Sequence, residues 1–571
     1  MCPEKAECKE TQSGAEGALS GVERLLELLL RLWSTTKPKP PRTYMLFALL
    51  LGSICAATLF IGAVPTFKFG HDDFFLLENG WRAIHGQRPQ LDYFSPWGPV
   101  TFLVVGFGLK LAHYSPNGIG YANSAVGLLI GLWAFGLGRN RLTFNAGLLL
   151  ALYTALLVCS PYAPGTSPLL SSHAMLYNRY GYALVALVML ECFMPLQGMK
   201  RSFADYLGGF STGAAVAVAL FLKASFLAGS IPFVVASFLF WGLNPRRLMG
   251  LILGFFVVSM ACMAYLRFDF AAVLHALHFA AGARTMTWSP KAPYYAVQAT
   301  VPSLGLAVAL GIGALFLGRG ARTRFDTIQA PLWMALLVYL VDIVLLSTNA
   351  QGSTLPLLPA FALLVCSQLS VLRQLSSPAE LRSGLPYQAS LFVLCGVLFL
   401  PQFASDAIGV TAAVLRKAHP PRQACGVRFN EPRLSGLILC DDPANAANRQ
   451  ETSNGSTYTS AVNEGTALLR LHANSTDKIL TMDMQNPFPY ALGWPPPLGG
   501  TASVSFNYTL SAKYRPTFDA YFGDATIVML PKHPAQSPEY IDGFNEIYLP
   551  AMLERYQLAA ESGNWRLYKR K

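Results

Sequence analysis

Residues 69–99 read FGHDDFFLLENGWRAIHGQRPQLDYFSPWGP and follow the first long apolar run of the chain. This short stretch holds three aspartates, two histidines, two arginines and six Phe or Trp side chains. A loop that only connects two membrane spans needs none of these groups. Asp72 and Asp73 are adjacent at the hydrocarbon boundary, where desolvation and like charge both raise the pKa of a carboxyl group. We therefore expect a catalytic loop here, in which a carboxylate acts as a general base.

The composition of the whole chain is that of a polytopic α-helical membrane protein. Of its 571 residues, 53% are hydrophobic and 13% are charged, whereas soluble domains carry about 25% charged residues. Apolar runs of roughly 17–20 residues recur, which is the length that spans a bilayer. The formal net charge of +12 comes from Lys and Arg clusters between these runs, as in cytoplasmic loops. It is therefore no indication of a nucleic-acid partner.

The positive clusters predict the orientation of about eleven spans. We expect these spans at residues 44–65, 121–138, 143–160, 180–197, 205–222, 224–241, 248–265, 299–317, 330–347, 355–372 and 387–405. Placing every cluster in the cytoplasm gives a regular alternation, puts residues 66–120 outside and sends the chain out after residue 405. The run 98–113 breaks that alternation if it is counted as a span. We therefore expect a juxtamembrane or re-entrant helix there.

The two ends of the chain have the composition of soluble segments. Residues 1–43 are expected to be cytoplasmic, with an interfacial helix at 21–33, ahead of a transmembrane domain at 44–405. Residues 406–571 are expected to form an α/β domain on the outer side. Its expected strands are 477–485, 501–509, 524–532 and 564–570, and its expected helices are 458–473 and 540–562. Cys425 and Cys440 lie in this part, and a disulfide between them is reasonable if it faces an oxidising compartment.

The motifs of the first outer loop resemble those of the GT-C superfamily of membrane glycosyltransferases, which use polyprenyl-phosphate-linked sugars as donors. The layout is similar to that of the lipid A aminoarabinose transferases and the protein mannosyltransferases. The resemblance rests on an acidic pair after the first span, a glycine about fourteen residues later and a Pro-x-x-Asp-Tyr stretch. The matching residues are Asp72, Asp73, Gly86, Pro89, Asp92, Tyr93 and Pro96.

The resemblance implies roles for several of these residues. In the superfamily the first acidic residue of the loop is the usual base, which points to Asp72, with Asp73 as the second acidic position. Asp92 and Tyr93 are then candidates for substrate binding. Many relatives carry a further acidic residue in the second outer loop, which this chain lacks, so the resemblance implies no certain cofactor and leaves a divalent metal open.

Further polar residues near the expected outer face are candidates for substrate binding. Tyr177, Asn178 and Arg179 end the second outer loop and suit a donor sugar or phosphate, although they also suit a polar membrane interface. Lys223 lies between two apolar runs, where a lysine is costly without a partner. It is either a phosphate contact or a side chain that reaches the interface. Arg284, in the loop 266–298, suits a phosphate or pyrophosphate.

The function that these observations favour is sugar transfer by a hexosyl- or pentosyl-transferase at the outer membrane face. The expected partners are a polyprenyl-phosphate-sugar donor, a glycan, lipid or protein acceptor, and the lipid bilayer. The expected location is a bacterial inner membrane, with the C-terminal domain in the periplasm or outside the cell. A sugar or polysaccharide ligase or polymerase of similar topology is an alternative that the sequence does not separate from this one.

An alternative from another class is a transporter or flippase of lipid-linked or small solutes, in which the acidic pair couples transport. That reading predicts ionisable residues deep in several spans, and Asp342 is the best candidate, with Glu191 nearer a span end. It also predicts internal repeats, and none is found in the sequence.

Overall fold

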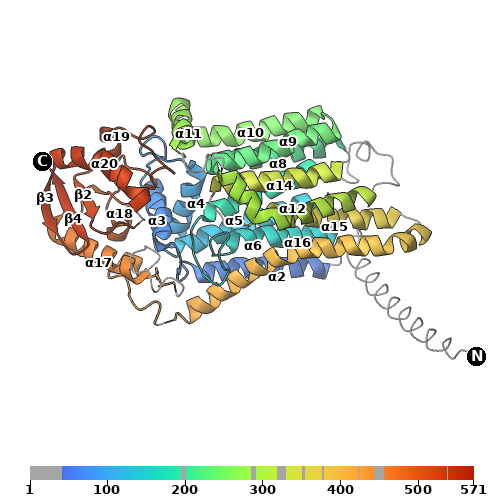
Figure 1. Ribbon diagram of the computed structural model, residues 1–571, viewed down its shortest axis with the longest axis horizontal. Helices are drawn as coiled ribbons and strands as arrows, with labels where there is room; N and C mark the ends of the chain where they lie inside the picture. Colours follow the sequence, from blue (N-terminus) through green and yellow to red (C-terminus); the bar gives the residue numbers. More distant parts are fainter. Residues whose placement is uncertain are drawn as a thin grey trace, which may run out of the picture.

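The computed structural model describes residues 41–194, 201–283, 291–317, 330–349, 354–375, 378–421, 423–442, 455–535 and 538–571. It is an elongated molecule in which a body of roughly parallel helices carries an α/β domain at one end (Figure 1). The predicted interfacial helix at 21–33 and the candidate Arg284 lie outside the described residues.

The helical body has a helix at each of the eleven positions where a span is expected. These helices are α2 (Pro41–Ile61), α5 (Gly118–Gly138), α6 (Phe144–Cys159), α7 (Leu176–Phe193), α8 (Arg201–Leu222), α9 (Ala224–Trp241), α10 (Pro245–Tyr265), α12 (Lys291–Leu317), α14 (Ala330–Asn349), α15 (Leu357–Leu375) and α16 (Pro378–Ala418). In the part of the chain that the structure describes, eight helices are long and apolar enough to cross a membrane. The prediction of a polytopic helical membrane protein is confirmed.

The last helix of the body is longer than its predicted span. α16 continues to Ala418 rather than ending near residue 405. The sequence after 405 keeps an apolar face against α2 and α6, where Val410 and Ala413 are buried. The first helix-stopping residues beyond it are Pro420 and Pro421, placed as prolines commonly are just after a helix end. The connection to the α/β domain therefore begins only after Ala418.

Three short helices lie close to the α/β domain (Figure 1). α3 (Gly70–Ile84) follows the first span, and α4 (Pro99–Leu111) is the short helix expected at 98–113. α11 (Phe270–Ala283) occupies the segment expected to form an outer loop. α3 is buried along most of its length, because its Phe, Leu and Trp side chains pack between the helical body and the α/β domain.

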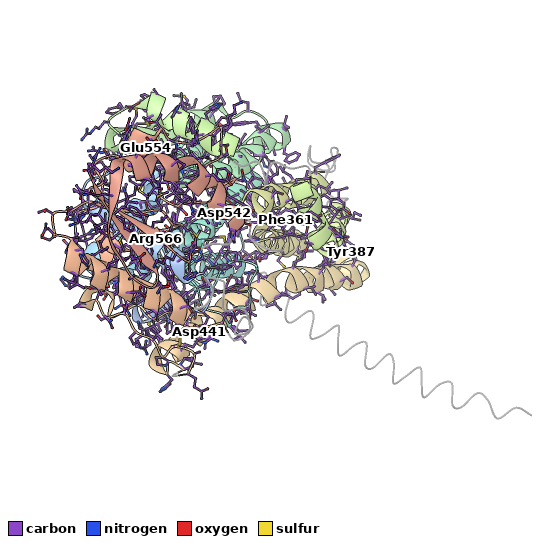
Figure 2. The ribbon with its side chains drawn as sticks, turned by 60° about the vertical axis from the view of Figure 1, so that its left-hand side comes forward. Phe361, Tyr387, Asp441, Asp542, Glu554 and Arg566 are labelled. Carbon is purple, nitrogen blue, oxygen red and sulfur yellow. A yellow bond between two sulfur atoms is a disulfide. The ribbon has the colours of Figure 1, made fainter. Side chains whose placement is uncertain are left out.

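The α/β domain contains a four-stranded mixed sheet with the order β1-β2-β4-β3. The strands are β1 (Ile479–Thr481), β2 (Ile527–Pro531), β3 (Tyr556–Glu561) and β4 (Trp565–Arg570), and only the β1–β2 pair is parallel. The helices are α17 (Gly455–His472), α18 (Phe488–Leu492), α19 (Phe518–Phe522) and α20 (Pro538–Arg555). Figure 2 brings this domain forward, with Arg566 on the sheet and Glu554 on α20, while Phe361 and Tyr387 mark the helical body behind it.

Two predicted elements of this domain are wrong. Residues 501–509 alternate like a strand but form a folded-back loop. The Thr509 hydroxyl accepts a hydrogen bond from the Ser505 amide (2.9 Å) and donates to the Ser503 carbonyl (2.9 Å). The predicted helix at 540–562 ends at Arg555, because Tyr556–Glu561 instead pairs with β4 as an antiparallel strand.

Candidate active site

The acidic pair lies in the first turn of α3. Phe69 precedes the helix with a positive φ of 57°, and its carbonyl accepts a hydrogen bond from the Asp72 amide (2.9 Å). This turn directs the chain into α3 directly after the segment that leaves the first span. Asp72 and Asp73 therefore lie at a helix N-terminus, where the helix dipole stabilises negative charge.

One cavity of about 180 Å³ brings three of the predicted residues together. Asp72, Tyr177 and Lys223 all line it, although they come from α3, α7 and the junction between α8 and α9. The end of α14 and a segment of the α/β domain complete the wall. The remaining lining residues are Phe75, Trp97, Met175, Thr348, Asn349, Met484, Ser503, Ser505, Tyr508 and Thr509.

The two carboxyl groups of the acidic pair have different surroundings. The Asp72 side chain is 19% exposed and lines the cavity, whereas Asp73 is 0% exposed and does not. Burial raises the pKa of Asp72, and the neighbouring His71 partly counters this. Burial raises the pKa of Asp73 well above its ordinary value; the nearby Thr66 side chain lowers it and the Asp72 charge raises it. Asp72 is therefore the carboxyl group that lies in the cavity wall, whereas that of Asp73 is enclosed by protein.

His71 lies beside the candidate base. Its Nε2 atom is 3.6 Å from Oδ1 of Asp72, and its side chain is nearly buried. Burial lowers the pKa of His71, while the Asp72 charge acts in the opposite direction. Asp72 and His71 offer a carboxylate and an imidazole, but the described residues contain no group of three His, Cys, Asp or Glu that would hold a metal ion. We therefore derive no step through a metal.

Lys223 interrupts the helical body at the cavity. It is the single residue between α8 and α9, and its extended backbone (φ −165°) separates the two helices. Its Nζ atom donates to Oδ1 of Asn349 (2.5 Å) and to Oδ1 of Asn178 (3.4 Å). It also lies 5.2 Å from the centre of the Tyr177 ring. Amide oxygens and an aromatic face contact this ammonium group, whose positive charge can attract an anion.

Asn178 and Arg179 do not line the cavity. Asn178 is fully buried behind Lys223, which it contacts. Arg179 is buried in an ion pair with Asp406 of α16 (3.1 Å) and also donates to the carbonyls of Leu157 and Tyr162. Its guanidinium group therefore ties α7 to α16 outside the lining of this cavity, and the sugar or phosphate contact stays a prediction.

Asp92 and Tyr93 also lie away from the cavity. The Asp92 carboxylate accepts a hydrogen bond from the Arg88 amide (2.6 Å) and so closes the turn between α3 and α4. Tyr93 is buried, with the Arg82 guanidinium 4.7 Å from its ring centre. Both residues therefore shape the first outer loop rather than the wall of the cavity.

The cavity also contains residues that the sequence did not single out. These are polar residues of ordinary type: Thr348 and Asn349 end α14, and Ser503, Ser505, Tyr508 and Thr509 come from the α/β domain. Thr348 and Asn349 could have been identified from the sequence as candidate site residues, because they are polar residues at the end of an apolar run. Nothing in the pattern of residues 503–509 distinguishes a substrate-facing loop from an exposed strand.

The α/β domain is held against α3 by hydrogen bonds to its loop 494–502. Asn79 donates to the Ala502 carbonyl (3.0 Å), and Trp81 donates to the Trp494 carbonyl (2.9 Å). Arg82 donates to the carbonyls of Pro497 (3.0 Å) and Gly499 (3.2 Å). The helix that carries Asp72 therefore also fixes the domain that supplies Ser503, Ser505 and Tyr508.

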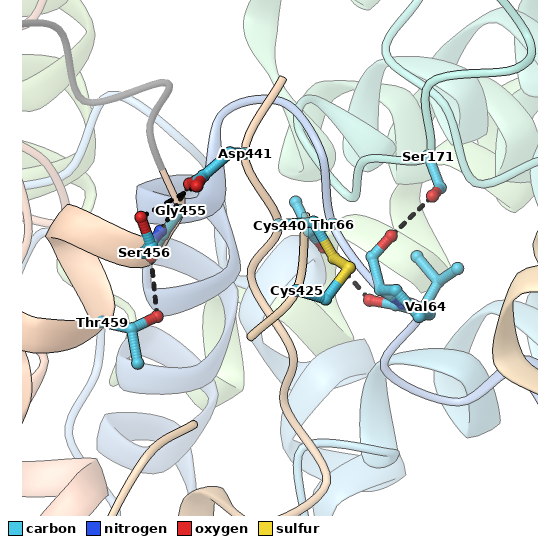
Figure 3. Close-up of a disulfide and its surroundings, with 10 residues drawn as sticks. Val64, Thr66, Ser171, Cys425, Cys440, Asp441, Gly455, Ser456 and Thr459 are labelled. Carbon is cyan, nitrogen blue, oxygen red and sulfur yellow. Dashed lines mark hydrogen bonds between the residues drawn. A yellow bond between two sulfur atoms is a disulfide. The ribbon is translucent and has the colours of Figure 1, made fainter. Parts of the chain in front are cut away.

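A disulfide fixes the segment that leads into α3 (Figure 3). Cys425 and Cys440 are joined, as expected if this part faces an oxidising compartment. The loop that they close pairs with the Thr66 backbone, which accepts from the Cys440 amide (2.8 Å) and donates to the Ile438 carbonyl (2.9 Å). Asp441 then accepts two hydrogen bonds from Ser456 at the start of α17. The disulfide loop thus connects the segment that leads into α3 to the α/β domain.

Comparisons with known proteins give similarity in structure only. No family model matches the chain, and no curated protein matches its sequence. The chain is similar to ArnT from Cupriavidus metallidurans in the apo state, with 14% identity, a TM-score of 0.46, and coverage of 92% of this chain and 98% of that chain. For ArnT from the same organism bound to undecaprenyl phosphate, the identity is 13% and the TM-score is 0.44, and the match covers 93% of this chain and 98% of that chain.

The chain is also similar to the archaeal oligosaccharyltransferase AglB from Archaeoglobus fulgidus, in complex with an inhibitory peptide and a dolichol-phosphate. The identity is 10%, the TM-score is 0.37, and the match covers 93% of this chain and 75% of that chain. Because every TM-score is below 0.5, we infer the function from the cavity and its side chains.

Proposed function

We propose that this protein is a GT-C-type glycosyltransferase that moves a sugar from a polyprenyl-phosphate donor to an acceptor hydroxyl at the outer face of a membrane. One observation carries the proposal: a single cavity has the carboxylate of Asp72 and the ammonium group of Lys223 in its wall. Sugar transfer from a phosphate leaving group requires a base for the acceptor and a cation for the departing phosphate. The first-loop motifs that resemble the GT-C superfamily surround the same aspartate.

The reaction follows from these two groups. The Asp72 carboxylate removes the proton from the acceptor hydroxyl, and the acceptor oxygen forms a bond to the anomeric carbon of the donor sugar. The bond between that carbon and the phosphate oxygen breaks, and its electron pair leaves with the lipid phosphate. Lys223 stabilises the negative charge that develops on this phosphate. The products are the glycosylated acceptor, the polyprenyl phosphate and a proton on Asp72.

The other lining residues suit a sugar. Trp97 and Tyr177 contribute aromatic surface, and their ring centres are 5.7 Å apart. Ser503, Ser505 and Tyr508 contribute hydroxyl groups from the α/β domain. Hydroxyl groups act as both donors and acceptors, so they match the hydroxyl groups of a hexose or pentose without requiring a charge on it.

The proposed location of the protein follows from the end of the helical body at which the cavity lies. Lys223 lies where two apolar helices meet, so a lipid phosphate at this depth keeps its chain among the spans. The cavity adjoins the α/β domain, whose disulfide suits an oxidising compartment. We infer a periplasmic or extracellular α/β domain, in a bacterial inner membrane, and a glycan, lipid or protein acceptor.

The residues that would favour a transporter have structural partners. Asp342 in α14 accepts hydrogen bonds from the amides of Leu357 (3.2 Å) and Leu358 (3.2 Å) and so caps α15. Glu191 in α7 pairs with Arg141 (3.1 Å). These contacts account for both carboxylates without a coupling role, so the acidic pair of α3 is better explained by catalysis.

The test is turnover of polyprenyl-phosphate sugars by the purified full-length protein in nanodiscs. Both sugar transfer and release of polyprenyl phosphate should be measured, because hydrolysis of the donor reports catalysis even when the acceptor is absent. We expect turnover of at least one donor by the wild type and loss of it in a folded Asp72→Asn variant. Full activity in that variant would overturn the proposal. It would also be overturned if the wild type turned over none of a set of polyprenyl-phosphate sugars that differ in the sugar.

A further inference from the structure

A second polar cavity lies at the opposite end of α8 from Lys223. It has a volume of about 260 Å³ and is formed where α7 and α9 end and α8 and α10 begin. Its lining includes Arg141, Glu191, Asp205, Asn244 and Arg247. Gly208 of α8 is separated from Leu222 by about 20 Å along the helix axis, so this cavity is distinct from the candidate active site.

The charged residues in this cavity are one ion pair, Arg141 with Glu191, and two residues, Asp205 and Arg247, with only uncharged hydrogen-bond partners among the described residues. Arg141 is bonded to Glu191 (3.1 Å), whose other oxygen accepts from the Thr212 hydroxyl (2.5 Å). Asp205 accepts a hydrogen bond from the Asn244 amide (2.9 Å), and within the described ranges no cation lies in ion-pair distance of it. Arg247 donates to the Glu191 carbonyl and, within the same ranges, has no carboxylate partner. Among the described lining residues, the Arg247 guanidinium and the Asp205 carboxylate are therefore the cation and the anion that a ligand could pair with.

A buried donor adds to the open cation. Arg141 is 5% exposed, and among the described residues its Nε atom has no hydrogen-bond acceptor. Leaving a buried N–H of a charged group without a partner is costly. Asn244 holds Arg247 in place by capping α10, since its side-chain oxygen accepts from the amides of Arg246 (3.1 Å) and Arg247 (3.4 Å). The guanidinium groups of Arg141 and Arg247 therefore offer fixed N–H donors to an anion.

An apolar groove adjoins this polar cavity. It has a volume of about 320 Å³ and shares Arg141, Ala204 and Gly208 with the polar cavity. The rest of its lining is mainly apolar and includes Trp133 of α5 and the exposed Leu207 of α8. α5 and α8 are both candidate membrane spans, so the groove faces the bilayer while the polar cavity lies at the end of the spans.

We propose that these two cavities together bind one zwitterionic phospholipid. Its phosphate contacts Arg247 and the Nε atom of Arg141, its ammonium group contacts Asp205, and one acyl chain lies in the groove beside Trp133 and Leu207. The balance of one open cation and one open anion favours a phosphate–ammonium headgroup over a headgroup with net negative charge. The Arg and Trp residues around this end of the bundle match the level of lipid headgroups. The proposal does not depend on the function of the other cavity.

The test is lipid binding to delipidated full-length protein in detergent, measured as the shift in unfolding temperature and as an apparent Kd. The probes are phosphatidylethanolamine, phosphatidylglycerol and soluble phosphoethanolamine. We expect phosphatidylethanolamine to bind most tightly and Arg247→Gln to weaken both lipids by about tenfold, as loss of a charge-assisted hydrogen bond implies. Asp205→Asn should remove the preference for phosphatidylethanolamine and leave phosphatidylglycerol unchanged.

Two matched variants complete the design. Arg246 is exposed and does not line the cavity, although it is the neighbour of Arg247 in the sequence. The Arg246→Gln variant should therefore bind lipid like the wild type. Gly136→Leu should weaken lipid binding without touching the charges, because Gly136 lines the groove and has open space where a side chain would begin. Equal binding by the wild type, Arg247→Gln and Gly136→Leu would overturn the proposal. Binding of phosphoethanolamine as tightly as the lipid would also overturn it, since the headgroup alone would then suffice.

Discussion

Asp72 and Asp73 are consecutive residues of α3, yet only the carboxyl group of Asp72 lines the cavity, while that of Asp73 is enclosed by protein. A helix places consecutive side chains about 100° apart, so one residue faces Lys223's cavity and the next faces the interior. Burial without a cation raises the pKa of Asp73 well above its ordinary value. An acidic pair in the sequence therefore corresponds to one carboxyl group in the cavity wall, the candidate base, and one enclosed carboxyl group.

The first prediction concerns this pair. Asp72→Asn should lower sugar transfer by about 10²- to 10⁴-fold, the usual contribution of a general base. Asp73→Asn replaces a buried carboxyl group that does not line the cavity by an amide of the same shape, so it should retain most of the activity. Initial rates with a saturating donor check both variants, and unfolding temperatures confirm that they fold. The reverse order of activities would assign the base to Asp73.

The second prediction is the pH dependence of transfer. The base must be ionised, so activity is complete above the pKa of Asp72 and is lost as the pH falls through it. Because burial raises that pKa, the acidic limb of kcat/KM should lie above the ordinary aspartate value of 3.8. His71 lowers the pKa of Asp72, so His71→Gln should move the acidic limb to higher pH. An unchanged limb in His71→Gln would show that another group controls it.

The third prediction concerns the leaving group. Lys223→Gln should reduce kcat by about 10²- to 10³-fold, as removal of a group that stabilises developing negative charge usually does. Lys110→Gln, at an exposed position of α4 outside the cavity, is the control and should behave like the wild type. A change in KM for the donor alone, with kcat preserved, would mean that Lys223 only binds the phosphate.

The fourth prediction concerns the loop that supplies Ser503, Ser505 and Tyr508. Thr509→Val leaves the Ser505 amide and the Ser503 carbonyl without their shared partner, at a cost of about 1–3 kcal/mol. KM for the substrates should rise because the loop loses its shape. Thr509→Ser keeps the hydroxyl group and should remain close to the wild type. Equal kinetics for the two variants would show that the shape of this loop does not contribute to substrate recognition.

The fifth prediction concerns the disulfide. Cys425 and Cys440 are 15 residues apart, and a disulfide that closes a loop of this length stabilises a fold by about 3 kcal/mol. The double variant Cys425→Ser/Cys440→Ser should unfold at lower temperature and lose activity, because the loop pairs with Thr66 just before α3. Cys262→Ser, at a half-buried free cysteine, is the control. A reductant should affect the wild type but not the double variant.

The sequence was sufficient for the helices and for part of the site. Apolar length locates the spans because one property, transfer of about 20 residues into hydrocarbon, determines them. Asp72 and Lys223 could be singled out because charged groups at the ends of apolar runs are costly and therefore informative. Tyr177 could be predicted as a site residue because it lies in a polar loop between two spans.

The features that the sequence did not indicate involve partners far away in the sequence. Arg179 resembles a substrate contact until Asp406 is known to lie beside it, and the two are 227 residues apart. Residues 503–509 have the alternation of a strand, but the Thr509 hydroxyl folds them back. Neither the ion pair nor the loop leaves a local pattern, because each depends on tertiary contacts that form only in the complete fold.

The hydrogen bond from Asn79 to the Ala502 carbonyl joins residues 423 positions apart, and this has a consequence for biosynthesis. Ribosomes add about 5–20 residues per second, so α3 is complete on the order of tens of seconds before residues 503–509 are made. During that interval α3 has no α/β domain to cover it. On the proposed function, a chain truncated before residue 503 lacks the hydroxyl groups of Ser503, Ser505 and Tyr508 in the cavity, so it should show little sugar transfer however well its spans assemble.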